Sequence, residues 1–197
     1  MKPSIITISR QFGSGGREIG AELAKRLNLP FFEKSLFEEA SKRSGIHPDF
    51  FEKAEARKNW YFSNAFLSSV DPLNMSLDDQ IYLAQVQTIR ELAEQGPCII
   101  VGRGANQILA DRNDLLNIFI YADRKVRLKR IIEVYGVPEN QAEKQMDIVD
   151  KNRATYLKHY TNQNYGKAEN YHLCIDSGKL GIENTIKIIG ASYRTLE

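Results

Sequence analysis

A cluster of glycines near the N-terminus carries the strongest chemical signal in the sequence. The segment reads Ser9-Arg10-Gln11-Phe12-Gly13-Ser14-Gly15-Gly16-Arg17 and follows a short apolar run over residues 5–8. Glycine allows backbone conformations in which several N–H groups turn toward one anion, and a helix that begins just after the loop adds the positive end of its dipole. We therefore expect the backbone from Phe12 to Glu18 to bind phosphate.

The loop departs from the P-loop pattern G-x-x-x-x-G-K-[ST] at its cation. In that pattern the lysine reaches the β- and γ-phosphates of a nucleotide, and the hydroxyl binds magnesium. Aligned without a gap, the chain has Gly16 at the lysine position and Arg17 at the Ser/Thr position. A shift of one residue would bring Arg17 to the lysine position, so two registers stay open.

The glycines also fit a second interpretation, a simple tight turn between a strand and a helix. The presence of glycines alone does not distinguish phosphate binding from a tight turn. The position of the loop favours phosphate binding, because it follows the first strand of an alternating strand and helix pattern, where such folds bind nucleotide phosphates. Phosphate binding is therefore the favoured interpretation.

Four further arginines are of interest: one follows a predicted strand, where an anion could be met, and three lie on predicted helices. Arg103 lies between two glycines, directly after the apolar run 98–101, which favours a cleft over an ion pair at the strand end. Arg127, Arg130 and Arg153 fall on predicted helices, where a solvated surface is a close alternative. The planar guanidinium group suits phosphate recognition.

The elements that must position these residues alternate along the chain. Short apolar runs predict strands over residues 5–8, 29–32, 98–101, 115–121 and 171–175. Helical spacing follows over residues 19–27, 35–44 ending at Gly45, 77–95 with Ser76 as N-cap, 123–135, 139–160 and from 181 onward. This alternation predicts an α/β fold with a parallel sheet covered on both faces.

The composition is that of an ordinary globular protein and narrows the range of partners. A length of 197 residues fits one domain, or a core with one inserted subdomain. The net charge of +2 gives no overall attraction to nucleic acid or to an anionic membrane, so anion binding must come from local arginines.

Membrane spans need roughly 18 apolar residues, and no segment approaches that length. Cys98 and Cys174 lie in apolar runs without metal-binding spacing, so we expect buried thiols and a cytoplasmic protein.

Taken together, these motifs resemble the cytidylate kinase-like family, a branch of the P-loop nucleoside monophosphate kinases. The resemblance rests on the glycine-rich loop, Gly102-Arg103, Arg127 and Arg130, Asp150-Lys151-Asn152-Arg153-Ala154, and Leu180-Gly181-Ile182-Glu183. It covers nearly the whole chain and is weakest over residues 46–95. It implies a three-layer α/β/α P-loop kinase fold with a five-stranded parallel sheet in a single domain. A monophosphate-binding insert is expected at about 34–75 and a helical lid at about 137–165.

The resemblance also implies ATP-dependent phosphoryl transfer to a small acceptor, with CMP or dCMP as first candidates. Such transfer needs charge neutralisation on the phosphates, with Mg²⁺ bridging those of the donor. ATP and Mg²⁺ are the implied cofactors, and the phosphates and water would hold the metal rather than a protein metal site. The implied catalytic residues are Arg17, Arg103 and Arg153. The implied nucleotide-binding residues are Gly13, Ser14, Gly15, Gly16, Arg17, Glu18, Arg127 and Arg130.

The chain departs from the family at several of these positions, which keeps a second function open. Gly16 replaces the lysine, and Glu39 and Met146 replace arginines of the insert and the lid. Val101 and Gly104 replace the aspartates that flank Gly-Arg in cytidylate kinases. The alternative is a non-catalytic nucleotide sensor on a degenerate kinase fold.

A third hypothesis starts from the aromatic run at residues 60–66. A groove that stacks single-stranded nucleic acid would have basic residues interleaved with the aromatic ones, and this run has none. We therefore expect no nucleic-acid partner, while a homo-oligomer formed through this run stays open. The three histidines have no partner at catalytic or metal-binding spacing.

Overall fold

The central sheet has five parallel strands in the order β2-β3-β1-β4-β5. A computed structural model describes residues 4–51 and 75–195. The strands are β1 (Ile5–Arg10), β2 (Phe31–Phe32), β3 (Cys98–Val101), β4 (Leu115–Tyr121) and β5 (Leu173–Asp176). Because β1 is the middle strand, the glycine-rich loop that follows it emerges at the centre of the carboxyl edge of the sheet.

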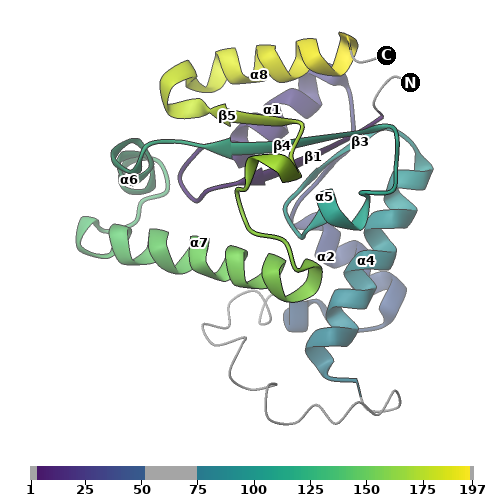
Figure 1. The fold of residues 1–197 in the computed structure, drawn as a ribbon. Helices are drawn as coiled ribbons and strands as arrows, with labels where there is room; N and C mark the ends of the chain where they lie inside the picture. The colour runs from purple at the N-terminus through teal and green to yellow at the C-terminus, as the bar shows by residue number, and fades with distance from the viewer. Residues whose placement is uncertain (1–3, 52–74, 196–197) are drawn as a thin grey trace.

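Helices cover both faces of the sheet, as Figure 1 shows. One face carries α1 (Gly16–Leu27) and α8 (Ser177–Thr195), and the other carries α2 (Ser35–Ser44), α4 (Leu77–Gln95) and α5 (Ala105–Ile108). Two further helices, α6 (Arg124–Glu133) and α7 (Glu139–Thr161), and the short 3₁₀ turn η1 (Ala168–Asn170) complete the described part. Helix α7 runs from beneath α6 toward α2 and α4.

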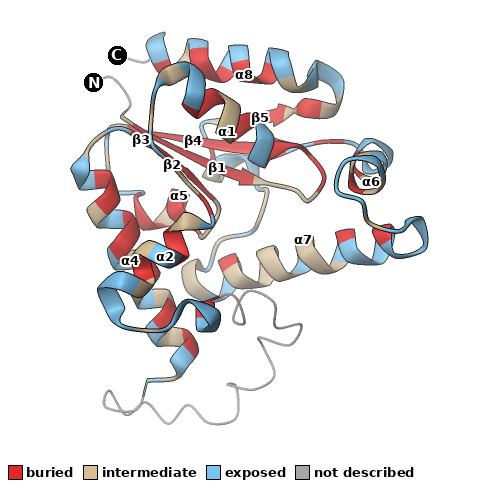
Figure 2. Ribbon diagram, turned by 180° about the vertical axis from the view of Figure 1, so that it is seen from behind, coloured by how far each residue is buried: buried red, intermediate tan, exposed pale blue. Residues whose placement is uncertain are grey.

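The apolar side chains of the strands form two cores, one on each face. In β1, Ile6 and Ile8 pack toward α1 and α8, whereas Ile5 belongs to the cluster that α4 and α5 complete. Neighbouring side chains on a strand point to opposite faces, so a strand buried on both sides needs a continuous apolar run. The inner strands β1, β3 and β4 are accordingly almost wholly red in Figure 2, where red marks buried residues.

The structure confirms the predicted α/β fold class and most element boundaries. Helix α2 ends at Gly45, and Ser76 caps α4 by accepting a hydrogen bond from the amide of Asp79 at 3.1 Å. The element α8 begins at Ser177, but it consists of two helical segments that meet at Gly181, where the backbone is not helical (φ +75°, ψ +163°). The predicted helix start near 181 therefore matches the start of the second segment.

The expectation for Cys174 was wrong. Cys98 is buried, but Cys174 is exposed on β5. Since β5 is an edge strand, it has a neighbouring strand on one side only, and its apolar run does not guarantee burial. The thiol of Cys174 is therefore accessible.

Parts of two expectations lie outside the described residues. The aromatic run at 60–66 and residues 52–74 of the expected insert belong there. Within the described ranges, none of the helices combines the length and the apolar character that a membrane crossing requires.

Candidate functional site

The backbone of the glycine-rich loop has the geometry of an anion-binding nest. Gly13 and Gly15 adopt left-handed conformations with φ of +80° and +79°, and Gly15 is the N-cap of α1. Among the described residues, the amides of Gly15, Gly16 and Arg17 donate no backbone hydrogen bond. These amides and the helix dipole together favour an anion at this point.

Close packing fixes the shape of the loop. A Cβ atom at Gly13 would lie 2.7 Å from the backbone oxygen of Arg127, so no larger residue fits there without movement of α6. The hydroxyl of Ser177, at the start of α8, donates to the backbone oxygen of Ser14 at 2.6 Å. Ser14 is itself buried, and its hydroxyl donates to the oxygen of Gln11.

Asp150 connects α7 to the loop. Its Oδ1 accepts a hydrogen bond from the amide of Phe12 at 2.7 Å, and its Oδ2 pairs with Nη1 of Arg127 at 2.6 Å. Nη1 of Arg127 also donates to the oxygen of Phe12 at 3.3 Å. Arg127 is almost fully buried, and its contacts with Phe12 and Asp150 connect α6 to the loop.

Two other predicted arginines also reach the loop. Nη1 of Arg153, on α7, donates to the backbone oxygen of Arg10 at 2.9 Å. Nη1 of Arg130, on α6, pairs with Glu18 at 2.5 Å, and its guanidinium carbon is 3.4 Å from the position of a Cβ atom at Gly15. Arg127, Arg130 and Arg153 therefore converge on one loop from two helices.

Sequence reasoning missed two residues at the centre of the site, Arg10 and Glu33. Glu33 follows β2 and is largely buried; its Oε1 lies 3.3 Å from Nη2 of Arg10, and its Oε2 lies 2.8 Å from Nε of Arg17. The signal that could have identified them was their place, since both are charged residues at the carboxyl ends of predicted strands. The side chain of Arg17 is 63% exposed, and that of Arg10 is 14% exposed.

Burial sets the electrostatics of Arg10. Burial, together with the nearby charges of Arg153 and Arg103, lowers the pKa of the Arg10 guanidinium to about 9, while Tyr165 and Glu33 act in the opposite direction. Arg10 and Arg17 thus share the carboxylate of Glu33 at the carboxyl edge of the sheet, with the charges of Arg153 and Arg103 nearby. Such a concentration of positive charge is stabilised when an anion binds.

Arg103 approaches the same region from β3. It adopts a left-handed backbone with φ of +60° between two glycines of positive φ. Its guanidinium carbon lies 4.0 Å from the ring centroid of Phe37, on α2, in a cation–π contact. The ring supports the side chain from the α2 side.

The structure gives physical reasons for two departures from the family pattern. Glu39 does not act as an isolated negative charge, because it pairs with Lys42 at 3.1 Å and Arg43 at 2.6 Å, which hold the pKa of its carboxyl below the usual value. Met146 is fully buried against Ile131 and Ala142, between α6 and α7. An arginine at this position would bury a charge.

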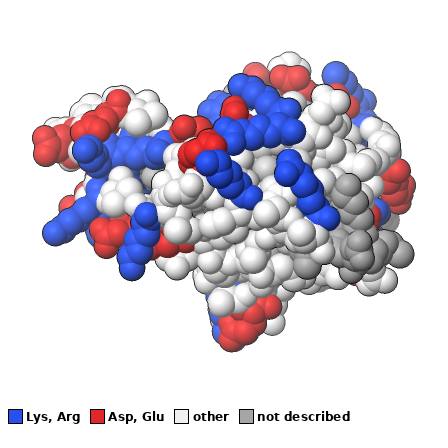
Figure 3. Space-filling model, turned by 90° about the horizontal axis from the view of Figure 1, so that it is seen from above, with Lys and Arg blue, Asp and Glu red and all other residues white. Residues whose placement is uncertain are grey.

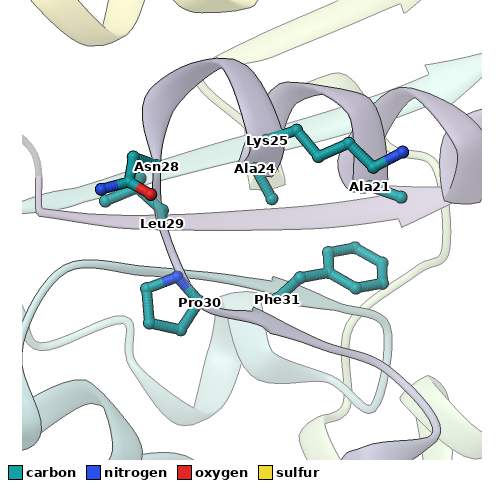
Figure 4. A pocket seen from close by; sticks show the side chains of 7 residues that line it. All are labelled: Ala21, Ala24, Lys25, Asn28, Leu29, Pro30 and Phe31. Atoms are coloured by element: carbon teal, nitrogen blue, oxygen red, sulfur yellow. The ribbon is translucent and has the colours of Figure 1, made fainter.

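No cluster of three metal-ligating residues exists among residues 4–51 and 75–195. A hollow of about 510 Å³ lies elsewhere, between the end of α1 and the start of β2 (Figure 4). Its lining includes Ala24, Leu29 and Phe31. It opens at the amino edge of the sheet, away from the glycine-rich loop.

Surface charge is mixed on the face that carries α1 and α8. Basic and acidic side chains both occur around its rim, and much of its centre is uncharged (Figure 3). This face thus offers no continuous basic surface of the kind that binds a nucleic-acid backbone.

The sheet order and the loop at the end of its central strand define the class of a P-loop kinase-like protein. The chain belongs to the Cytidylate kinase-like family, whose sequence profile matches residues 5–179.

Solved structures share this fold over their full length. An uncharacterized protein from Eubacterium ventriosum ATCC 27560 is 28% identical with a TM-score of 0.73, over 98% of this chain and 99% of that one. A shikimate kinase from Acinetobacter baumannii in complex with shikimate is 14% identical with a TM-score of 0.55, over 99% and 96%. A deoxyadenosine kinase from M. mycoides with bound dATP is 15% identical with a TM-score of 0.50, over 98% and 100%. No curated protein matches the sequence.

Proposed function

We propose that the chain transfers the γ-phosphoryl group of ATP to a small acceptor, with a nucleoside monophosphate such as CMP or dCMP as the first candidate. One observation carries the proposal: arginines from separate elements surround a loop whose glycines form an anion-binding nest. Phosphoryl transfer consists largely of positioning two anions and neutralising charge, and the loop with its surrounding arginines supports a role in both.

Each group has a distinct place in the proposed reaction. The loop amides, with Gly13, Ser14, Gly15, Gly16, Arg17 and Glu18, hold the donor phosphates. Arg127 and Arg130 support this cradle from α6. Arg103 meets the acceptor anion from the end of β3, and Arg153 on the lid helix α7 reaches the transferring group when the acceptor is in place. Arg17 adds charge at the mouth of the loop, from its position beside Glu33.

Magnesium would bind here with the nucleotide. The residue at the Ser/Thr position of the P-loop pattern is Arg17, which cannot ligate a metal ion, and the hydroxyl of Ser14 already donates to a backbone oxygen. The donor phosphates and water would therefore hold Mg²⁺, which neutralises their charge. The chain's own residues supply the amides and the guanidinium groups.

The acceptor is the least defined part of the proposal. Glu39, at the position where the family has a phosphate-binding arginine, is neutralised by Lys42 and Arg43 and neither attracts nor repels an acceptor strongly. Arg103 is then the main cation from the β3 side. The shared fold of shikimate kinases and deoxynucleoside kinases argues for testing acceptors beyond CMP.

A coupled assay of ADP release tests the proposal. The acceptor panel contains nucleoside monophosphates, deoxynucleosides and shikimate. We expect ADP release that depends on one of these acceptors, and a loss of rate in Arg153→Ala. Arg124→Ala is the matched control, because Arg124 lies on the neighbouring helix and pairs with Glu143 and Asp147 at the surface.

A nucleotide sensor is the second candidate, favoured by glycine at the lysine position of the loop. In that case calorimetry shows ATP binding that Arg153→Ala leaves unchanged, and no acceptor supports ADP release. In either case we propose a reducing, cytoplasmic location, on the free thiols of Cys98 and Cys174.

A further inference from the structure

The glycine-rich loop has the residue types of the P-loop pattern at exchanged positions. The pattern G-x-x-x-x-G-K begins with a glycine and ends with a lysine. Aligned on Gly15, the chain has Arg10 at the first position and Gly16 at the last. Compared with the P-loop pattern, the positions of the cation and of the glycine are therefore exchanged.

The two ends of the loop are in contact, and this contact explains the exchange. A Cβ atom at Gly16 would lie 2.5 Å from the Cβ atom and 3.0 Å from the Cγ atom of Arg10. Real side chains do not approach so closely, so only one of the two positions can carry a long side chain. In this chain Arg10 carries the long side chain, and Gly16, which has no side chain, leaves room for it.

A second glycine accommodates the far end of the same side chain. The Nη1 atom of Arg10 lies against Gly102, at the end of β3, where a Cβ atom would collide with it. The backbone oxygen of Arg10 accepts hydrogen bonds from Arg153 and from the hydroxyl of Tyr165. The arginine is thus held at both ends, and its guanidinium is directed across the carboxyl edge of the sheet.

We propose that Arg10 takes the place of the missing P-loop lysine, with its guanidinium on the terminal phosphates of the bound nucleotide. This inference rests on the proposed function, because it assumes that the loop binds ATP. Glu33, 3.3 Å from Arg10, positions the guanidinium between the loop and β2. The nearby positive charges of Arg153 and Arg103 further favour the binding of an anion at the guanidinium of Arg10.

The proposal predicts that the exchange can be reversed. Arg10→Gly combined with Gly16→Lys restores the standard pattern and leaves the net charge unchanged. The backbone permits the lysine, since Gly16 has no positive φ, and the glycine at position 10 removes the atoms with which it would collide. Gly16→Lys alone retains that collision and serves as the matched comparison.

The experiment measures ATP affinity by calorimetry on the full chain, together with ADP release and a thermal melt for each variant. Arg10→Gly should weaken ATP binding roughly tenfold to a hundredfold, the usual effect of losing a hydrogen bond to a charged group. The exchanged double variant should return to within about threefold of wild type. Arg26→Ala, at a surface pair with Glu183, controls for loss of any arginine and should leave affinity unchanged.

Either of two results overturns the proposal. If Arg10→Gly leaves the affinity for ATP unchanged, Arg10 does not bind the phosphates. If the double variant folds but still binds ATP weakly, Arg10 acts only through packing. If the double variant does not fold, Arg10→Lys and Arg10→Met decide: the lysine should retain ATP affinity and the methionine should lose it, whereas equal affinity overturns the proposal.

The same measurements separate this inference from the proposed function. ATP binding that depends on Arg10 without ADP release for any acceptor refutes phosphoryl transfer and supports the role of Arg10. ADP release that is insensitive to Arg10→Gly supports transfer and refutes the role of Arg10. A wild-type chain that does not bind ATP overturns both.

Discussion

The carboxylate of Asp150 accepts a hydrogen bond from the backbone amide of Phe12 at 2.7 Å, so helix α7 contacts the glycine-rich loop directly. The two residues are 138 positions apart in the chain. The same carboxylate pairs with Arg127, which places α6, α7 and the loop in one hydrogen-bonded unit. Through Asp150, a movement of helix α7 is therefore coupled to the glycine-rich loop.

Asp150→Ala should therefore weaken both stability and nucleotide binding. It removes the partner of a nearly buried arginine and of the Phe12 amide, which we expect to lower the free energy of unfolding by about 2 kcal/mol. ATP affinity should fall as well, because the loop loses its anchor. Urea unfolding and calorimetry measure the two effects.

Asp147→Ala is the control for Asp150→Ala. Asp147 lies on the same helix, but it is exposed and pairs with Arg124 at the surface. Exposed pairs contribute about 0.5 kcal/mol, so its replacement should change little. Equal effects of the two variants would contradict the anchoring role of Asp150.

Gly13→Ala should destabilise the protein far more than Gly45→Ala. Both glycines have positive φ, +80° and +73°, so both alanines incur a backbone cost of about 1 kcal/mol. At Gly45 the added Cβ atom meets nothing within 4 Å, whereas at Gly13 it meets the backbone of Arg127 at 2.7 Å. Thermal melting of the two variants gives the comparison, and similar melting temperatures would show that the loop relaxes freely.

The ion pair between Asp114 and Arg112 should make part of the stability dependent on pH. Arg112 and, more weakly, the hydroxyl of Ser4 hold the pKa of the Asp114 carboxyl below its usual 3.8. A carboxyl whose pKa is lower in the folded state stabilises it above the unfolded pKa and loses this contribution as pH falls through the folded pKa. Asp114→Asn should thus cost about 1 kcal/mol at neutral pH and progressively less below about pH 4. Urea unfolding across this range tests it, and a constant difference would refute it.

The two cysteines should differ sharply in reactivity. Cys98 is buried in β3, and burial raises the pKa of its thiol to about 11, whereas Cys174 is exposed on the edge strand. A thiol-specific reagent at mildly alkaline pH should therefore label one cysteine in the native protein and two after denaturation. Cys174→Ser should abolish the native labelling, and Cys98→Ser should preserve it. Native labelling that survives in Cys174→Ser would contradict this assignment.

The sequence predicted most of the elements because their signals are local. The run 115–121 matches β4, and the capping serine at 76 marks the start of α4. Gly181 also marked a real boundary, since it divides α8 into two helical segments. A glycine of positive φ is common at helix ends, and the signal that the sequence did not give was the short helical segment from Ser177 before it.

The candidate site was predictable only in part. The arginines at 127, 130 and 153 were selected from the family resemblance, and the structure brings all three to the loop. Their partners were not predictable, since Glu18 and Asp150 come from other elements. Met146 and Glu39 were interpreted as losses from a binding site, while the structure places one in a core and the other in surface ion pairs.

The sequence by itself determined the order of strands and helices and the place of the glycine-rich loop, because apolar periodicity and glycine content act over a few neighbouring residues. Only the tertiary structure decided which side chain occupies the space beside the loop. Gly16, Glu33 and Gly102 shape the surroundings of Arg10 from three separate segments. Contacts of this kind depend on packing across the sheet, which no local pattern encodes.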